Sequence, residues 1–419
     1  MAKQDYQKFS KRVYVGQQYD YITGKKKDYR PTISVLARTK KEADFLIEKE
    51  RRKLMETFSA SGKLMTLNQL RTEYYTVKNG LKPTTKSTDL QSYEVIEPHF
   101  GNVRLIDLTT DAFRLFFESL KARRKSLSYQ HNIFKVVNKY LNFAVKQGHI
   151  NYNPLQRLSD AAYAKAPEVI VDPTLVDKIT DFFQKVFTAQ TNDTFQDVKF
   201  KAMVLLAADG CLRRGELMAL RWSKIRLDEG WMMVDERVYD ISKRIAKIIG
   251  CETRDFDTPK TKGSVRKLPL SAVTCYWLTE YKRLSDLYLK ENRLNNPEDY
   301  VLFSHSKLPN RTKYNKKRAA NAPYIDVKLI STTSYRDLIN SYCKKYKVEH
   351  FKTHDIRKVF YTLRINEGCQ DKYNDYVLGH SLKASDVPYT LSFFGLAQKN
   401  HLIFESALNN IINPAKQEE

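Results

Sequence analysis

The stretches His354-Asp355-Ile356-Arg357 and Leu378-Gly379-His380 are the most informative part of this sequence. The first places a histidine and an arginine three residues apart, which puts both side chains on one face of a helix. The second is followed nine residues later by Tyr389. The segment therefore offers two imidazoles, a guanidinium and a phenol as candidates for one site.

An upstream arginine has the same helical spacing. In the stretch Gly210-Cys211-Leu212-Arg213-Arg214-Gly215-Glu216-Leu217, Glu216 follows Arg213 by three residues after an apolar run. On a helix, the carboxylate could then hold the guanidinium in place. An ordinary surface ion pair is the alternative interpretation.

A lysine-rich stretch lies between two predicted strands. Residues 258–270 read Thr-Pro-Lys-Thr-Lys-Gly-Ser-Val-Arg-Lys-Leu-Pro-Leu. Gly263 permits a tight bend, which could push Lys262 into a site instead of leaving it in solvent. Lys260 lies two residues away on the same side of a strand, so it is the alternative candidate.

Together these side chains indicate chemistry on a phosphate. Arginines can fork onto the non-bridging oxygens, histidines can donate hydrogen bonds or move protons, and a lysine can protonate a leaving oxygen. A tyrosine hydroxyl can attack phosphorus and form a covalent ester. The pattern lacks the clustered Asp and Glu that would hold two magnesium ions, so we predict a reaction that needs no metal and no other cofactor.

The composition favours a nucleic acid as the partner. The chain has 419 residues with 72 Lys and Arg against 48 Asp and Glu, which leaves a formal net charge of +24. Such a charge favours a polyanionic partner, and a basic surface that serves solubility or attachment to ribosomes is the alternative. No apolar run approaches the roughly 18 residues of a membrane span, and the first residues lack an apolar signal core. We expect a soluble cytoplasmic protein that binds no membrane.

The N-terminal part predicts a small antiparallel sheet followed by a helix. Residues 12–36 alternate in the strand period, with Lys25, Lys26 and Lys27 near the turn. The period becomes helical at Thr39, whose hydroxyl would cap the helix while a glutamate three residues later reaches back. A basic unit of this kind could lay its sheet on DNA, and a solvated hairpin is the alternative.

The middle part predicts helices alone, because residues 66–158 show apolar faces at helical spacing. Arg123 and Arg124 lie in a basic junction between two helices. We favour phosphate contact over simple solvation there because the whole chain is so basic. Pro167 and Pro173 interrupt helix formation and mark a linker.

The last part mixes helices with a short sheet, since residues 231–234 and 265–270 predict strands. The expected fold class is therefore multidomain α+β: a small sheet-plus-helix domain, a helical domain, and a mainly helical domain with a small antiparallel sheet. Beyond Tyr389, an amphipathic helix is predicted. Its apolar stripe would consist of Leu402, Ile403, Leu408 and Ile411.

In order and spacing, the motifs of the last part resemble those of the tyrosine recombinase family, phage-type integrases in particular. These motifs are Arg213 with Glu216, Lys262, His354-x-x-Arg357, Leu-Gly-His380 and Tyr389. The strand-rich basic unit that leads to Thr39-Lys40-Lys41-Glu42-Ala43 looks like the arm-site DNA-binding domain of such integrases, and residues 96–109 look like their helical core-binding domain. The resemblance extends over nearly the whole chain and is weakest beyond Leu396.

The resemblance implies a phosphate clamp. Arg213 and Arg357 would hold the scissile phosphate, with Glu216 supporting the pocket behind them. His380 would donate a hydrogen bond to a phosphate oxygen.

It also implies the groups that move protons and form the covalent bond. Tyr389 would be the nucleophile that forms a 3′-phosphotyrosyl link, and His354 would accept its proton. Lys262 would be the general acid for the departing 5′ oxygen.

The implied division of the chain has five regions. They are an arm-type DNA-binding domain (residues 1–62), a helical core-site DNA-binding domain (63–160), a linker (161–173), a catalytic domain (174–395) and a C-terminal tail (396–419), which would form an inter-protomer helix or pack in cis.

The implied function is site-specific DNA recombination that integrates and excises a mobile element or prophage, without metal or ATP. Double-stranded DNA with core and arm attachment sites would be the substrate, and the protein would act as a homotetramer in the cytoplasm of a bacterial host. A host DNA-bending protein and a directionality factor are further expected partners.

One departure from the family pattern concerns the nucleophile. Pro388 stands just before Tyr389, where it restrains the preceding residue towards extended geometry. Tyr373 and Tyr376 are the outside candidates for the nucleophile. A displaced Tyr389 would favour a catalytically weak DNA-binding or architectural protein of the same fold, while a metal-dependent nuclease would need a ligand cluster that the sequence does not show.

Overall fold

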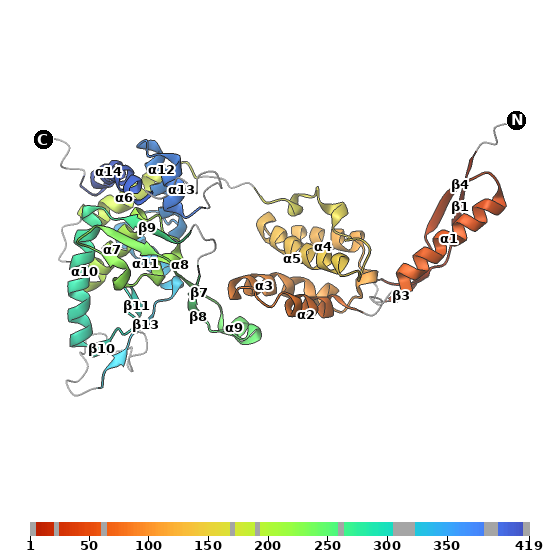
Figure 1. Ribbon diagram of the computed structural model, residues 1–419, viewed down its shortest axis with the longest axis horizontal. Coiled ribbons are helices and arrows are strands. Elements are labelled where there is room, and N and C mark those ends of the chain that lie inside the picture. Colours follow the sequence, from red (N-terminus) through yellow and green to blue (C-terminus); the bar gives the residue numbers. More distant parts are fainter. Residues whose placement is uncertain are drawn as a thin grey trace. The chain divides into compact units, whose positions relative to one another are not determined.

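The computed structural model describes residues 6–20, 25–59, 65–167, 172–188, 193–258, 264–304, 323–380 and 393–413. The chain forms two compact units, Met1–Ile170 and Val171–Glu419. Figure 1 colours the first unit from red to yellow and the second from yellow-green to blue. Each unit has its own hydrophobic core.

The first unit begins with two antiparallel strand pairs and a helix. Strand β1 (Gln7–Arg12) pairs with β4 (Thr32–Ala37), and β2 (Gly16–Asp20) pairs with β3 (Lys25–Tyr29). Helix α1 (Lys40–Ser59) follows. The predicted order of sheet and helix is confirmed, although the first strand begins five residues before Arg12.

A small apolar cluster packs α1 against the strand pair β1–β4. It consists of Val13, Val15, Ile33 and Ile47. The predicted cap at the start of α1 is also present: Thr39 Oγ1 accepts a hydrogen bond from the Glu42 amide at 3.2 Å, and the Glu42 carboxylate accepts one from the Arg38 amide at 2.8 Å.

The rest of the first unit is helical, as predicted. Its elements are α2 (Leu67–Val77), α3 (Pro83–Phe100), η2 (Leu105–Asp107), α4 (Thr110–Ala122), α5 (Leu127–Lys146), η3 (Gln156–Leu158) and η4 (Ala162–Ala164). Thr66 and Gln69 form a complete capping box before α2. Aromatic side chains from α3, α4 and α5 fill the core between the helices.

The start of the predicted linker belongs to this helical core. The ring of Tyr163, in η4, stacks on Phe117 with centroids 4.3 Å apart, and the carbonyl oxygen of Tyr163 lies 3.3 Å from Nδ1 of His131. A linker that starts at residue 161 is therefore too early. The folded part of the first unit extends at least through η4.

The second unit consists mainly of helices, and the greater part of α7 (Phe195–Asp209) is buried among them. The helices are α6 (Leu175–Thr188), α7, α8 (Arg214–Ala219), α9 (Lys243–Ile249), α10 (Ala272–Glu291), α11 (Thr332–Tyr346), α12 (Thr353–Asn366), α13 (Asp371–Leu378) and α14 (Phe393–Ile412), with a short turn η5 (Trp222–Lys224). Residues 200–208 of α7 are all buried, and they are apolar except for Lys201. Helix α10 packs along α7 (Figure 1).

A three-stranded antiparallel sheet lies beside these helices. Strand β6 (Trp231–Val234) pairs with β5 (Ile225–Arg226) on one side and with β9 (Arg266–Pro269) on the other. Both longer strands were predicted from the sequence. Between β6 and β9 the chain forms a second hairpin, in which β7 (Arg237–Asp240) pairs with β8 (Arg254–Asp257). Helix α9 connects these two strands at the far end of the hairpin (Figure 1).

Two short strand pairs complete the second unit. Strand β11 (Phe303–Ser304) pairs antiparallel with β13 (Lys328–Leu329), whereas β10 (Leu294–Asn295) pairs parallel with β12 (Ile325–Asp326). The architecture is thus the expected mainly helical domain with small sheets, and the only departure in the described strand pairs is this one parallel pair.

The C-terminal helix α14 packs on the core of its own chain. Phe404 and Leu408 are fully buried in the main cluster of the second unit, whereas Leu402 and Ile403 are exposed. The predicted apolar stripe was therefore half wrong: positions 397, 404, 408 and 411 share one helical face, and 402 and 403 point the other way. In the part of the chain that the structure describes, no helix has the length and apolarity to cross a membrane.

Candidate active site

A pocket of about 270 Å³ opens on the surface of the second unit. Its lining consists of Arg213, His354, Arg357, Lys358, Tyr361, Leu378 and His380. These residues come from the start of α8, the first turns of α12 and the end of α13. Four residues that the sequence singled out, in three separate motifs, are therefore neighbours in space.

Arg357 forms the buried floor of the pocket and is only 5% exposed. Its guanidinium donates to the main-chain carbonyls of Cys211 and, at 2.7 Å, Leu378. Burial and the neighbouring cation Arg213 lower the pKa of Arg357 to about 10. The group remains charged at neutral pH, in a position where an anion would relieve the repulsion between the two guanidiniums.

Arg213 sits at the rim, just before α8, and its side chain is 38% exposed. Nη1 donates to Oε1 of Glu216 at 2.8 Å, and the Arg213 amide donates to Oε2 at 3.0 Å. Glu216 is buried, so this pair is not the surface ion pair that the sequence left open as an alternative. Burial alone would raise the pKa of Glu216, but Arg266 and Arg213 bring it below its ordinary value.

His354 lies on the first turn of α12, one turn before Arg357, as the spacing predicted. Partial burial lowers the pKa of His354, and the neighbouring cations Arg357 and Lys358 lower it further. The imidazole is therefore neutral at pH 7 and can accept a proton.

His380 follows α13 at a turn that only a glycine fits easily. Gly379 has φ +64°, and the amides of Gly379 and His380 donate to the carbonyls of Tyr376 and Asp375 at 2.9 and 3.0 Å. This is the helix ending that favours glycine in the left-handed conformation. Nδ1 of the exposed His380 ring lies 3.3 Å from the Asp375 carboxylate, which orients the ring and leaves Nε2 for a ligand.

Three candidates lie outside the described residues. They are Lys262, its alternative Lys260, and Tyr389. The described elements nearest to them in the sequence are β8, which ends at Asp257, β9, which begins at Arg266, and the helix α14, which begins at Phe393.

The two outside candidates for the nucleophile do not reach the pocket. Tyr373 is fully buried, and its hydroxyl accepts a hydrogen bond from Arg364 at 3.2 Å. The Tyr376 hydroxyl is hydrogen-bonded to both main-chain groups of Lys267, at 2.8 and 3.1 Å. Both phenols are part of the packing of α13 on its neighbours.

Lys358 and Tyr361 are pocket residues that the sequence analysis did not identify. Lys358 donates to the Asp355 carboxylate at 3.0 Å, and burial raises the pKa of Tyr361. A signal for them was present: positions 354, 357, 358 and 361 follow the i, i+3, i+4, i+7 pattern of one helical face. Extending the motif by one turn would have found both.

The predicted DNA-binding residues of the first unit lie at the surface or in strand β3. Arg123 and Arg124 directly follow α4 and are exposed, and Arg124 has φ +54°. Lys25, Lys26 and Lys27 form the first half of β3, paired with residues 18–20 of β2.

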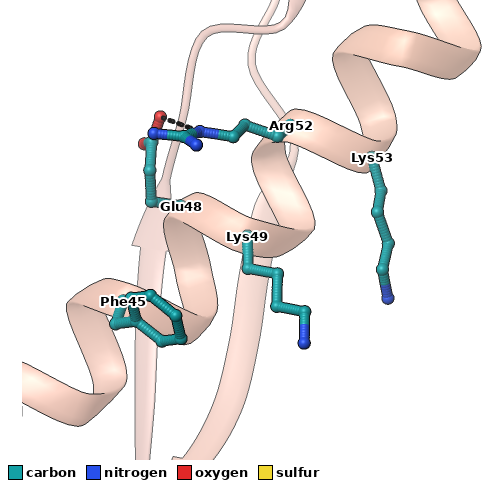
Figure 2. A pocket seen from close by; sticks show the side chains of 5 residues that line it. All are labelled: Phe45, Glu48, Lys49, Arg52 and Lys53. Carbon is teal, nitrogen blue, oxygen red and sulfur yellow. Dashed lines mark ion pairs between the residues drawn. The ribbon is translucent and has the colours of Figure 1, made fainter.

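A second pocket, of about 360 Å³, lies on the outer face of α1. Figure 2 shows the side chains that line it, with Arg52 reaching back to Glu48 at 3.9 Å. The lining residues are Phe45, Glu48, Lys49, Arg52 and Lys53. This pocket is a basic surface around the exposed ring of Phe45, and its lining contains no histidine, tyrosine, serine or cysteine.

The first pocket can bind a phosphate and exchange protons with it. Two guanidiniums face the same opening as a neutral imidazole and a second imidazole held by a carboxylate. Within the described ranges, no group of three or more His, Cys, Asp or Glu side chains is arranged to hold a metal ion. The cations of the pocket are therefore the groups available there to neutralise the charge of a bound phosphate.

Comparison with known proteins identifies the class to which this fold and site belong. The model of the phage integrase family matches residues 176–394, which include the whole pocket. The match covers more than half of the chain, so the protein belongs to the phage integrase family, the tyrosine recombinases. The family expected from the sequence is thereby confirmed.

Individual relatives agree with this assignment. The chain is 22% identical over 396 residues to a protein from Caldanaerobacter subterraneus subsp. tengcongensis described as tyrosine recombinase XerC-like, covering 86% of this chain and 91% of that protein.

Solved structures show the same fold. The Tn1549 transposon integrase in complex with transposon right end DNA superposes with a TM-score of 0.55 at 17% identity, over 80% of this chain and 98% of that one. A lambda integrase dimer bound to a COC' core site gives a TM-score of 0.52 at 14% identity, over 89% and 91% of the two chains. The predicted multidomain α+β class is confirmed.

Proposed function

We propose that the protein is a site-specific integrase that cuts and rejoins DNA through a 3′-phosphotyrosyl intermediate, and so integrates and excises a mobile element or prophage. One observation carries the proposal: the guanidiniums of Arg213 and Arg357 line one pocket with the imidazoles of His354 and His380. Such a group of cations fits a phosphodiester in transfer between two oxygens.

In the proposed reaction the hydroxyl oxygen of Tyr389 attacks the scissile phosphorus. The bond between phosphorus and the 5′ oxygen breaks, and the 3′ phosphate becomes a tyrosyl ester. His354 accepts the phenol proton, for which its lowered pKa keeps it neutral. Lys262 protonates the departing 5′ oxygen, Arg213 and Arg357 neutralise the charge on the non-bridging oxygens, and His380 donates a hydrogen bond to one of them.

The second half of the reaction reverses the first. A 5′ hydroxyl of the partner strand attacks the phosphotyrosyl ester and releases Tyr389. One phosphodiester replaces another, so the change in free energy is small and neither ATP nor a metal ion is required.

The placement of the other tyrosines supports Tyr389 as the nucleophile. The hydroxyls of Tyr373 and Tyr376 are already bound inside the fold. Tyr361 does line the pocket, on the same helical face as His354 and Arg357. Its replacement by Phe is therefore the control for the assignment of Tyr389 as the nucleophile.

The proposed substrate is double-stranded DNA with core and arm attachment sites, bound by a homotetramer in the bacterial cytoplasm. Arg123 and Arg124 would contact phosphates of the core site, and Lys25, Lys26 and Lys27 those of the arm site. The relatives solved with transposon and core-site DNA support this choice of substrate. A host bending protein and a directionality factor would complete the assembly.

The test is a covalent adduct on a nicked core-site duplex, taken from the repeats that flank the gene, in the presence of EDTA. We expect a protein-DNA adduct that resists denaturation and that disappears in Tyr389→Phe but persists in Tyr361→Phe. Tight binding without an adduct would favour the catalytically weak DNA-binding protein instead. Cleavage that requires magnesium would point to a nuclease and overturn the proposal.

A further inference from the structure

Arg266 is a buried arginine to which the sequence analysis assigned no role. It lies at the start of β9 and is 2% exposed. All three guanidinium nitrogens donate hydrogen bonds: Nη2 to Glu216 at 3.0 Å, Nε to the Val377 carbonyl at 2.9 Å, and Nη1 to the Ser264 carbonyl at 2.8 Å. One side chain thus joins α8, α13 and the entry to β9.

The first of these bonds, to Glu216, links Arg266 indirectly to Arg213. Oε2 of Glu216 accepts from Arg266 and from the Arg213 amide, while Oε1 accepts from the Arg213 guanidinium. Glu216 is buried, so it needs a positive neighbour to stay ionised, and Arg266 is the strongest one. A neutral residue in place of Arg266 would remove the largest attraction that keeps the carboxylate charged, and it would weaken the hold of Glu216 on Arg213.

The second bond belongs to a row of three at the end of α13. The consecutive carbonyls of Val377, Leu378 and Gly379 accept hydrogen bonds from Arg266, Arg357 and the Ser264 hydroxyl, at 2.9, 2.7 and 3.3 Å. These carbonyls immediately precede His380. Arg266 and Arg357 together therefore fix the main chain just before His380, whose ring is oriented by Asp375.

Gly379 leaves room for this arrangement. A Cβ at position 379 would lie 2.9 Å from Nη1 and 3.2 Å from Cζ of Arg266. The guanidinium therefore lies directly against the glycine backbone of the turn. Any larger residue would displace either the turn or Arg266.

We propose that Arg266 is a positioning residue for the transesterification, which holds Arg213 through Glu216 and His380 through the turn at Gly379. The inference rests on the proposed function. Arg266 does not line the pocket, so it acts through these two side chains and touches no reacting atom.

The experiment compares Arg266→Gln with the wild type on two nicked duplexes that differ at one atom. In one the scissile group is the natural phosphodiester; in the other it is a methylphosphonate, which lacks the negative charge that the clamp neutralises. On the phosphodiester we expect first-turnover adduct formation to fall by about 10²-fold, as for the loss of one preorganised donor. On the methylphosphonate the deficit should shrink to less than about tenfold, because less charge has to be neutralised.

Arg221→Gln is the matched control. Arg221 bonds to Glu236 at 3.3 Å and to Glu298 at 2.9 Å, and it does not line the pocket. Replacing Arg221 should change the rate of adduct formation by the same factor on both duplexes. If Arg266→Gln melts below the assay temperature, Arg266→Lys takes its place, since it keeps the charge but cannot make three fixed donations.

The outcomes separate the two proposals. An equal deficit on the two duplexes would show that Arg266 only stabilises the fold, and a rate equal to that of the wild type would overturn its role altogether. A wild-type protein that forms no adduct on the phosphodiester would overturn the proposed function, and the positioning role with it.

Discussion

Arg357 donates from Nη2 to the main-chain carbonyl of Leu378 at 2.7 Å, so the more deeply buried of the two pocket arginines also fixes the turn before His380. Arg357→Lys keeps a charge but loses the planar fork that reaches two carbonyls. We expect adduct formation to fall by about 10²–10³-fold with little loss of DNA affinity, measured by single-turnover cleavage and filter binding. A parallel loss of affinity and rate would show that Arg357 acts mainly in binding.

The pKa of His354 predicts how cleavage depends on pH. A base that accepts the phenol proton works only when neutral, and burial together with Arg357 and Lys358 lowers the pKa of this imidazole from its ordinary 6.5. The rate should therefore fall in acidic buffer with its midpoint below pH 6.5. His354→Gln should be slow throughout and lack this acid limb. A wild-type rate that already halves at or above pH 6.5 would contradict the assignment.

Gly379 and Gly368 both have positive φ, +64° and +80°, and form a matched pair. An added Cβ meets Arg266 at position 379 but meets nothing within 4 Å at position 368. Gly368→Ala should cost about 1 kcal/mol of stability, from the backbone conformation alone. Gly379→Ala should cost more and should also slow adduct formation at a temperature where both variants are folded. Equal behaviour in melting and cleavage assays would argue against contact between the turn and Arg266.

Helical periodicity explains which parts of the site could be predicted. The pairs Arg213 with Glu216 and His354 with Arg357 lie one turn apart, and the structure brings both pairs to one region. Spacing cannot show which side chains a distant segment will cover. Arg266 reads in the sequence as one more cation of a lysine-rich stretch, and only the packing of α8 and α13 on β9 buries it.

The same limit applies to the fold. Strands 231–234 and 265–270 and the helices of the middle part follow from local pattern, and the structure contains them. The stripe of α14 was misassigned because the helix carries apolar residues on two faces. Leu402 and Phe404 are equally apolar in the sequence, and only tertiary packing decides which of them is buried.

Lys199 is a buried cation whose replacement should stabilise the protein. Burial lowers its pKa to about 8, and it makes one hydrogen bond, to the Phe303 carbonyl at 3.2 Å. The native state then binds fewer protons than the unfolded state between about pH 8 and pH 10.5, so the cost of burial is complete below pH 8 and vanishes above pH 10.5. Lys199→Met should gain about 2 kcal/mol at pH 7, and the gain should shrink towards pH 10.

The control for Lys199 lies two residues further along the same helix. Lys201 is also buried, but its ammonium is paired with Asp193 at 2.7 Å. Lys201→Met should therefore destabilise the protein, because it leaves the carboxylate without its partner. Chemical denaturation of both variants at pH 7 and pH 10 measures the difference. A loss of stability in both would mean that Lys199 is better compensated than its single hydrogen bond implies.

Helix α14 offers a direct test of packing in cis. Phe404 is fully buried, with its ring 3.7 Å from the Arg364 guanidinium and 6.0 Å from the Phe360 ring, whereas Leu402 is 66% exposed. Phe404→Ala should lower the free energy of unfolding of the DNA-free protein by about 3 kcal/mol, because it opens a cavity in the core. Leu402→Ala should change it by less than about 0.5 kcal/mol. If α14 instead leaves its own core in the free protein, Phe404→Ala would have as little effect as Leu402→Ala, since the ring would already be in solvent in the folded state.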